Sequence, residues 1–281
     1  MFQKLAFVAK RFVSSPEYRI TFFSWAIHRL RGAHGPVLTI EAPDGSTYTL
    51  AEWKNWSEYE FWKKYKVPAT DGKIIQAALA KPGSVCLDVG ANIGLYSLYI
   101  AACGTEKVYA FEPAKDNFER LLKNLVKNPS LAGRIFPLQK AVSDTHQQLS
   151  VYFNATCPGE TKVGVETSGS ESCEAVSLDD FCRNESILKV DLLKIDVEGF
   201  EMHVLAGCKE LLAARRIEII FFESFDNALR QYGSSRLDQW NYLHACSYHI
   251  FSLSGTRLNS QSFCQSDASD YVATYHDIFP L

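Results

Sequence analysis

The sequence predicts an α/β fold built on a doubly wound, mostly parallel sheet of about seven strands. From about residue 82, short apolar β-branched runs alternate with helical periods, the pattern of parallel strands joined by crossover helices. The first run ends in a glycine-containing loop that leads directly into a helix. Open α/β sheets bind ligands at such strand ends, so this loop predicts where the site lies.

Seven apolar runs supply the strands, and three helical periods lie between them. The predicted strands are residues 84–89, 107–111, 134–138, 191–196 and 217–223, with 249–253 and 271–275 closing the sheet. The predicted helices are residues 94–102, 115–127 and 200–214. These elements assign residues 81–281 to one cofactor-binding domain.

Residues 1–80 do not share this pattern and are expected to form an N-terminal extension or cap. Residues 1–35 are basic and aromatic and predict two short helices. Peripheral contact with anionic lipid is one interpretation of them, and packing on the main domain or at a homodimer contact is the other. Residues 36–80 begin with a hairpin pattern around Pro43-Asp44-Gly45, and we expect them to cover the substrate side of the core.

Composition restricts the partners and the compartment. The net charge of −3 gives no strong field that would attract nucleic acid. The eight cysteines are scattered singly, without a C-x-x-C pair, which favours reduced thiols over a disulfide framework or a zinc site. No apolar run reaches the roughly 18–20 residues of a membrane span. We therefore expect a cytoplasmic protein, with peripheral membrane contact left open.

The first predicted strand leads into a loop with the spacing G-x-x-x-G, which runs from Asp88 through Gly90 and Asn92 to Gly94. Glycines let the backbone turn tightly and approach a ligand closely. The second strand ends in Glu112, roughly two dozen residues further on, where an acid can accept both ribose hydroxyls of an adenosine. This ordered set predicts a Rossmann-like adenosine site made by these five residues.

Two classes of adenosine cofactor compete for this loop. A dinucleotide requires G-x-G-x-x-G, so that backbone amides can surround a pyrophosphate at a helix N-terminus. Here the spacing differs, and acidic Asp88 stands just ahead of the loop. A negative side chain suits a ligand with a sulfonium and an amino group better than one with phosphates. The loop therefore favours S-adenosylmethionine, with S-adenosylhomocysteine as its product.

Ser143 and Asp144 follow the third predicted strand, where a loop could reach the adenine ring. We predict that they contact the adenine edge. A plain turn explains the same two residues equally well.

Ionisable side chains gather at the carboxyl ends of the fourth and fifth strands, and one of them, Asp196, lies beside the cofactor crevice and is also expected to contact the cofactor. Lys194, Asp196 and Glu198 alternate in sequence, so an extended run would place all three on one side. Glu223 ends the next strand and is expected to face the same crevice. His203, one turn into the following helix, is a weaker candidate because such a histidine is more often at the surface. A structural salt bridge is the alternative to a catalytic role for the cluster.

With these motifs the sequence resembles the FkbM-type methyltransferases. The resembling segments are D-V-G-A-N-I-G-L-Y-S at 88–97, F-E-P at 111–113, S-L-D-D-F at 177–181 and L-L-K-I-D-V-E-G-F-E at 192–201. The last is the most particular to that family. The resemblance implies a class I methyltransferase fold and O-methylation of a hydroxyl on a small molecule, sugar or glycolipid.

O-methylation gives the ionisable cluster a task, since an alcohol must lose its proton as it attacks the methyl group. We assign the general base to Asp196 or Glu198. Lys194 would hold the carboxylate or stabilise the developing alkoxide, and Glu223 is a second acid. Carboxylates also suit Mg²⁺, but Lys194 already balances charge there, so we expect no metal.

Three other functions fit the sequence less well. A nicotinamide-dependent oxidoreductase is disfavoured by the loop spacing and by the lack of a Tyr-x-x-x-Lys pair after the fourth strand. A non-catalytic adenosine-binding scaffold is disfavoured because Asp88, Glu112, Asp196 and Glu198 are all retained. Methylation of a nucleic-acid base usually involves an Asn/Asp-Pro-Pro-Tyr/Phe loop, which is absent after the fourth strand.

Overall fold

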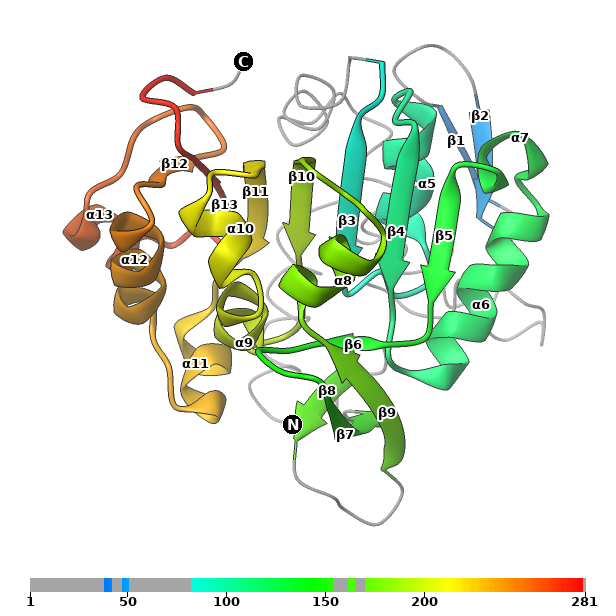
Figure 1. The fold of residues 1–281 in the computed structure, drawn as a ribbon, viewed down its shortest axis with the longest axis horizontal. Coiled ribbons are helices and arrows are strands. Elements are labelled where there is room, and N and C mark those ends of the chain that lie inside the picture. The colour runs from blue at the N-terminus through cyan, green and yellow to red at the C-terminus, as the bar shows by residue number, and fades with distance from the viewer. Residues whose placement is uncertain (1–37, 42–46, 51–81, 154–160, 165–169, 280–281) are drawn as a thin grey trace, which may run out of the picture.

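Seven strands form the main sheet in the part of the chain that the computed structural model describes, which is residues 38–41, 47–50, 82–153, 161–164 and 170–279. Their order across the sheet is β12-β13-β11-β10-β3-β4-β5 (Figure 1). All neighbours are parallel except β13, which runs antiparallel to β11 and β12. The strands are β3 (Val85–Val89), β4 (Lys107–Phe111), β5 (Ile135–Leu138), β10 (Val190–Ile195), β11 (Ile217–Glu223), β12 (His249–Ser252) and β13 (Asp270–Thr274).

This strand order fixes where a ligand can bind. The chain builds outward from β3 through β4 to β5, then returns to place β10 on the other side of β3. The carboxyl ends of β3 and β10 therefore meet where the winding reverses, which is the position of ligand sites in open α/β sheets. The order confirms the predicted Rossmann-like, doubly wound sheet, and it is the order of the class I methyltransferase fold.

Helices cover both faces of the sheet, because its central strands are apolar on both sides (Figure 1). On one face, α5 (Leu95–Ala102) and α6 (Lys115–Val126) pack with α7 (Pro129–Ala132) and strand β2. The other face is covered by α8 (Leu178–Asn184), α9 (Glu201–Ala206), α10 (Lys209–Ala213), α12 (Arg236–Ala245) and α13 (Ser260–Cys264). The short α11 (Asp226–Leu229) and the 3₁₀ turn η1 (Arg230–Tyr232) follow β11.

The predicted helix over residues 200–214 is wrong in one respect, because the structure has two helices there, α9 and α10. The break falls at Gly207 and Cys208. A Cβ on Gly207 would lie 2.1 Å from the carbonyl oxygen of Ser143. The close approach of that loop requires glycine, so a contact between distant segments sets the break.

A second, four-stranded sheet was not predicted from the sequence. Its order is β6-β9-β7-β8, and it lies beyond the carboxyl ends of β3, β4, β5 and β10 (Figure 1). Its strands are β6 (Ala141–Val142), β7 (Gln147–Phe153), β8 (Thr161–Gly164) and β9 (Glu171–Val176). The small sheet therefore borders the edge at which the predicted site residues lie.

At the N-terminal end, β1 (Leu38–Glu41) and β2 (Thr47–Leu50) pair antiparallel, as the hairpin pattern predicts. The backbone of Thr49 exchanges two hydrogen bonds of 2.6 Å with the side-chain amide of Asn128, which holds β2 against the main domain. Residues 1–37 and 51–81 lie outside the described residues, and with them the predicted basic helices and most of the predicted cap. No helix of the described ranges has the length and apolarity needed to cross a membrane.

Candidate functional site

The glycine loop lies between the ends of β4 and β10. Gly90 donates its amide to the carbonyl of Phe111, at 3.0 Å. Gly90, Asn92 and Gly94 have φ of 83°, 52° and 86°, the left-handed region that glycine adopts readily. A Cβ on Gly90 would lie 1.8 Å from the carbonyl oxygen of Asp196. The sequence prediction of a tight turn at this strand end is confirmed, and it is the approach of β10 that requires Gly90.

Glu112 directly follows β4, and its side chain points back to the loop. Its Oε2 accepts the amide of Asn92 at 2.8 Å, and its Oε1 accepts the amide of Ala114 at 2.9 Å. The residue is 2% exposed. Burial raises the pKa of Glu112 to about 7, although the two amides oppose the shift. Glu112 therefore has two protonation states near neutral pH, in direct contact with the loop.

Asp88 and Lys194 form a buried ion pair beneath the loop. Their charged groups are 3.5 Å apart, and the side chains are 0% and 3% exposed. The hydroxyl of Ser97 donates to Asp88 at 2.5 Å. Burial raises the pKa of Asp88, and Lys194 opposes that shift. Burial alone lowers the pKa of Lys194, but Asp196 and Asp88 outweigh it, so that the ammonium stays charged.

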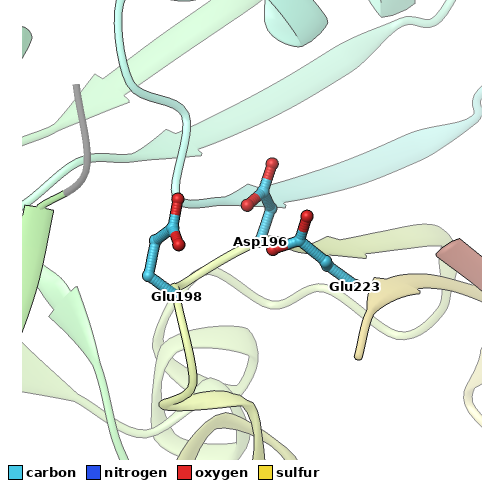
Figure 2. Close-up of side chains that lie close together, drawn as sticks. All are labelled: Asp196, Glu198 and Glu223. Atoms are coloured by element: carbon cyan, nitrogen blue, oxygen red, sulfur yellow. The ribbon is translucent and has the colours of Figure 1, made fainter. Parts of the chain in front are cut away.

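Three carboxylates converge where β10 and β11 end. Figure 2 shows the side chains of Asp196, Glu198 and Glu223 close together, with Glu223 directed toward Asp196. One carboxylate oxygen from each residue lies within 4.8 Å of the other two. Asp196 is 37% exposed, and its Oδ2 lies 3.2 Å from the Nζ of Lys194. Burial, then Asp196 and Glu198, raise the pKa of Glu223 well above its usual range. The predicted cluster is thus assembled, and repulsion within it favours retention of a proton at Glu223.

The backbone conformation predicted to bring these side chains together is wrong. We expected an extended run to place Lys194, Asp196 and Glu198 on one side, but β10 ends at Ile195. Glu198 has φ of 54°, in the left-handed region that a glutamate rarely adopts. A turn, and not strand alternation, therefore brings Glu198 to Asp196.

Ser143 and Asp144 follow β6 and lie against α9. The hydroxyl of Ser143 donates to Asp144 at 2.9 Å and accepts the side-chain amide of Gln147 at 3.0 Å. His203 is half-buried, and burial lowers its pKa while Asp144 raises it.

Two residues of this neighbourhood were missed by the sequence analysis. Glu201 is 2% exposed, accepts the amide of Gly199 at 3.0 Å, and has a pKa that burial raises to about 7. Its position in the K-I-D-V-E-G-F-E run was the available signal. Tyr232 lies in η1, packs on Phe200 and donates to the carbonyl of Val163. No local pattern marks Tyr232, because its contacts come from distant segments.

The residues of the site could bind two kinds of species, an adenosine cofactor and a divalent cation. Glu112 and the glycine loop are placed as an adenosine cofactor requires, one at each of two adjacent strand ends. The oxygens of Asp196, Glu198 and Glu223 are hard ligands of the type that Mg²⁺ accepts. Lys194, in contact with Asp196, already supplies a positive charge to this cluster.

Several known proteins with similar sequences are methyltransferases by name. The hexuronic acid methyltransferase AglP of Haloferax volcanii is 32% identical over 142 residues, which are 50% of this chain and 56% of that protein. The 31-O-demethyl-FK506 methyltransferase FkbM of Streptomyces tacrolimicus is 31% identical over 208 residues, 62% of this chain and 76% of that protein. This chain therefore spans little more than half the length of the first relative.

A solved structure of a methyltransferase FkbM from Methylobacillus flagellatus KT superposes with a TM-score of 0.46 at 16% identity. The match covers 77% of this chain and 53% of that one. The sequence model of the methyltransferase FkbM domain matches residues 88–250, which include the glycine loop, Glu112 and all three clustered carboxylates. Since that match covers more than half of the 281 residues, the chain belongs to the FkbM methyltransferase family.

Proposed function

We propose that this chain is an S-adenosylmethionine-dependent O-methyltransferase that acts on a hydroxyl of a sugar, a glycolipid or another small molecule. The observation that carries the proposal is the convergence of Asp196, Glu198 and Glu223 beside the glycine loop. Two features therefore lie at the same edge of the sheet. One is a group of acids that could accept a hydroxyl proton, and the other is a loop suited to an adenosine cofactor.

The cofactor would lie at the carboxyl ends of β3 and β4. Gly90, Asn92 and Gly94 would approach it with their backbone, Glu112 would accept its ribose hydroxyls, and Ser143 and Asp144 would contact the adenine edge. The neighbouring charge supports this choice, because the clustered carboxylates attract a cationic sulfonium and repel a pyrophosphate.

When bound, S-adenosylmethionine supplies an activated methyl group, which leaves its sulfur as the acceptor oxygen attacks the carbon from behind. The chain must align that oxygen, an effect worth up to about 7–11 kcal/mol. It must also take the hydroxyl proton, for which a positioned base typically contributes about 10²–10⁴ in rate. We assign this proton to Asp196 or Glu198.

The other ionisable groups would set the charge around that base. Lys194 pairs with Asp196 and holds its carboxylate in place, which makes Lys194 a positioning group for a base at residue 196. Glu223, whose pKa is raised, adds a carboxyl that is readily protonated to the same cluster. With Lys194 balancing charge, the proposed reaction includes no metal ion.

The names of the relatives support the acceptor class. One is called a hexuronic acid methyltransferase, and the other a 31-O-demethyl-FK506 methyltransferase, so that both names are consistent with methylation of hydroxylated small molecules. The small sheet, β6–β9, borders the site and is available to contact the acceptor (Figure 1).

Calorimetric titration with S-adenosylhomocysteine, with NADH titrated in parallel, tests the cofactor. We expect saturable binding of S-adenosylhomocysteine alone, lost in Glu112→Ala. Glu119→Ala is the matched control, because Glu119 is an exposed glutamate on α6. Binding of NADH alone would overturn the proposal and identify the loop as a dinucleotide site.

A further inference from the structure

The loop that carries Glu198 is held in a conformation that its own sequence does not favour. Glu198 and Gly199 have φ of 54° and 108°, both left-handed. A glutamate adopts this region only where its surroundings enforce it, and such residues cluster at functional sites. The contacts that enforce the turn therefore control where the Glu198 carboxylate lies.

Those contacts come from the segment after β11. A Cβ on Gly199 would lie 2.4 Å from the carbonyl oxygen of Ala228 in α11 and 3.1 Å from Cδ2 of Tyr232 in η1. The ring of Tyr232 also meets that of Phe200 edge to face, with centroids 5.2 Å apart. Phe200 in turn stacks on His203 at 4.0 Å. Tyr232 thus touches both residues that follow Glu198.

The same tyrosine is fixed from the other side by the small sheet. Its hydroxyl donates to the carbonyl of Val163 in β8 at 2.6 Å. Beside it, the ammonium of Lys162 donates to the side chain of Gln231 at 2.6 Å. Among the described residues, β8 pairs only with β7, so these two contacts hold its outer side. Tyr232 therefore links the Glu198 loop to a strand that is remote in sequence.

We propose that Tyr232 is a positioning residue that holds the turn at Glu198 and so places its carboxylate against Asp196 and Glu223. The proposal rests on the proposed function only for its kinetic consequence. The hold on the loop is a structural claim and can be tested without an acceptor. Tyr232 makes no contact with reacting atoms in this account, and acts through Gly199 and Phe200.

The ring and the hydroxyl of Tyr232 make different contacts, so a substitution can remove one set of contacts and keep the other. Tyr232→Phe keeps the ring on Gly199 and Phe200 but loses the hydrogen bond to Val163. Tyr232→Leu loses both. Gln231→Ala is the matched control, because it removes the neighbouring tie to Lys162 while leaving the ring in place. If the ring positions Glu198, the leucine variant alone disturbs the loop.

Hydrogen–deuterium exchange of the peptide covering residues 197–203 measures the hold directly. We expect faster exchange there in Tyr232→Leu, and wild-type exchange in Tyr232→Phe and Gln231→Ala. The dissociation constant of S-adenosylhomocysteine should be unchanged in all three, because the glycine loop and Glu112 are untouched. Wild-type exchange in Tyr232→Leu would overturn the proposal even if that variant lost activity.

Turnover supplies the second readout, with labelled S-adenosylmethionine and a hydroxylated acceptor found by screening sugars. A displacement near 1 Å at a reacting group costs about 10²-fold in rate, so kcat of Tyr232→Leu should fall by about that factor with the KM for S-adenosylmethionine unchanged. Tyr232→Phe should restore kcat. Equal losses in both variants would overturn the proposal, because the hydroxyl and not the ring would then matter. Failure of the wild-type protein to bind S-adenosylhomocysteine would contradict the proposed function. The exchange experiment would then still decide whether Tyr232 holds the Glu198 loop.

Discussion

The ammonium of Lys194 lies 3.2 Å from the carboxylate of Asp196, with the lysine side chain only 3% exposed. The same ammonium lies 3.5 Å from the carboxylate of the fully buried Asp88 and serves as its counter-ion. One cation therefore joins the interior beneath the glycine loop to the acidic cluster at the sheet edge, and this predicts its effect on stability.

Lys194→Met should destabilise the fold by about 3–5 kcal/mol, because it leaves the carboxylate of Asp88 buried without its counter-ion. Urea unfolding measures this free energy. Arg183→Met is the control, since Arg183 forms ion pairs with Asp180 and Glu210, and all three side chains are at least 54% exposed. Such a surface pair contributes about 1 kcal/mol or less. Equal losses in the two variants would show that burial of the pair does not matter.

Glu198→Asn should be more stable than Glu198→Gln by about 1 kcal/mol, because asparagine accepts the left-handed backbone that glutamine resists. Both variants remove the same charge from the cluster, so the comparison isolates the backbone contribution. Thermal unfolding of the two proteins, measured side by side, gives the difference. A glutamine variant as stable as the asparagine variant would mean that residue 198 is not strained.

Binding of S-adenosylhomocysteine should weaken as the pH falls, by up to about tenfold between about pH 8 and about pH 6. Burial raises the pKa of Glu112 to about 7, so its carboxylate becomes protonated across this interval and loses the capacity to accept two ribose hydroxyls. Calorimetric titration at several pH values measures the change. Glu112→Gln should bind weakly with a flat pH profile, and a flat profile in the wild-type protein would contradict the assignment.

Glu223→Gln should raise the melting temperature at neutral pH. The pKa of Glu223 is higher in the folded chain than in the unfolded chain, first because of burial and then because of Asp196 and Glu198. A raised pKa contributes stability that is complete below the ordinary carboxyl pKa and is lost as the pH rises through the raised value. The advantage of the glutamine variant should therefore grow with pH and vanish near about pH 4. A variant less stable than wild type at neutral pH would contradict this.

Much of the fold was predictable because the central strands are buried on both faces. β10 is buried along its whole length, so it reads as a continuous apolar run that patterning detects. The predicted ranges 107–111 and 217–223 are the observed β4 and β11. The predicted strand ends then indicated where Glu112, Asp196 and Glu223 lie, because the carboxyl ends of parallel strands lie at the same edge of the sheet.

The remaining features depend on contacts between segments that are distant in sequence. The break between α9 and α10 reflects the approach of Ser143 to Gly207. The left-handed turn at Glu198 lies against α11 and η1, and Tyr232 is tied to β8. Local propensity carries no information about these contacts between distant segments. The strand-alternation argument therefore identified the residues that cluster but gave the wrong backbone geometry for how Glu198 reaches Asp196.

The central claim is that carboxylates at this sheet edge deprotonate the acceptor of a bound methyl donor. Its most direct test is the rate of labelled methyl transfer from S-adenosylmethionine to a sugar hydroxyl in Asp196→Asn and Glu198→Gln, with S-adenosylhomocysteine binding measured on the same proteins. We predict a loss of about 10²–10⁴ in rate in the variant that lacks the base, with the dissociation constant unchanged. Wild-type rates in both variants would contradict the account.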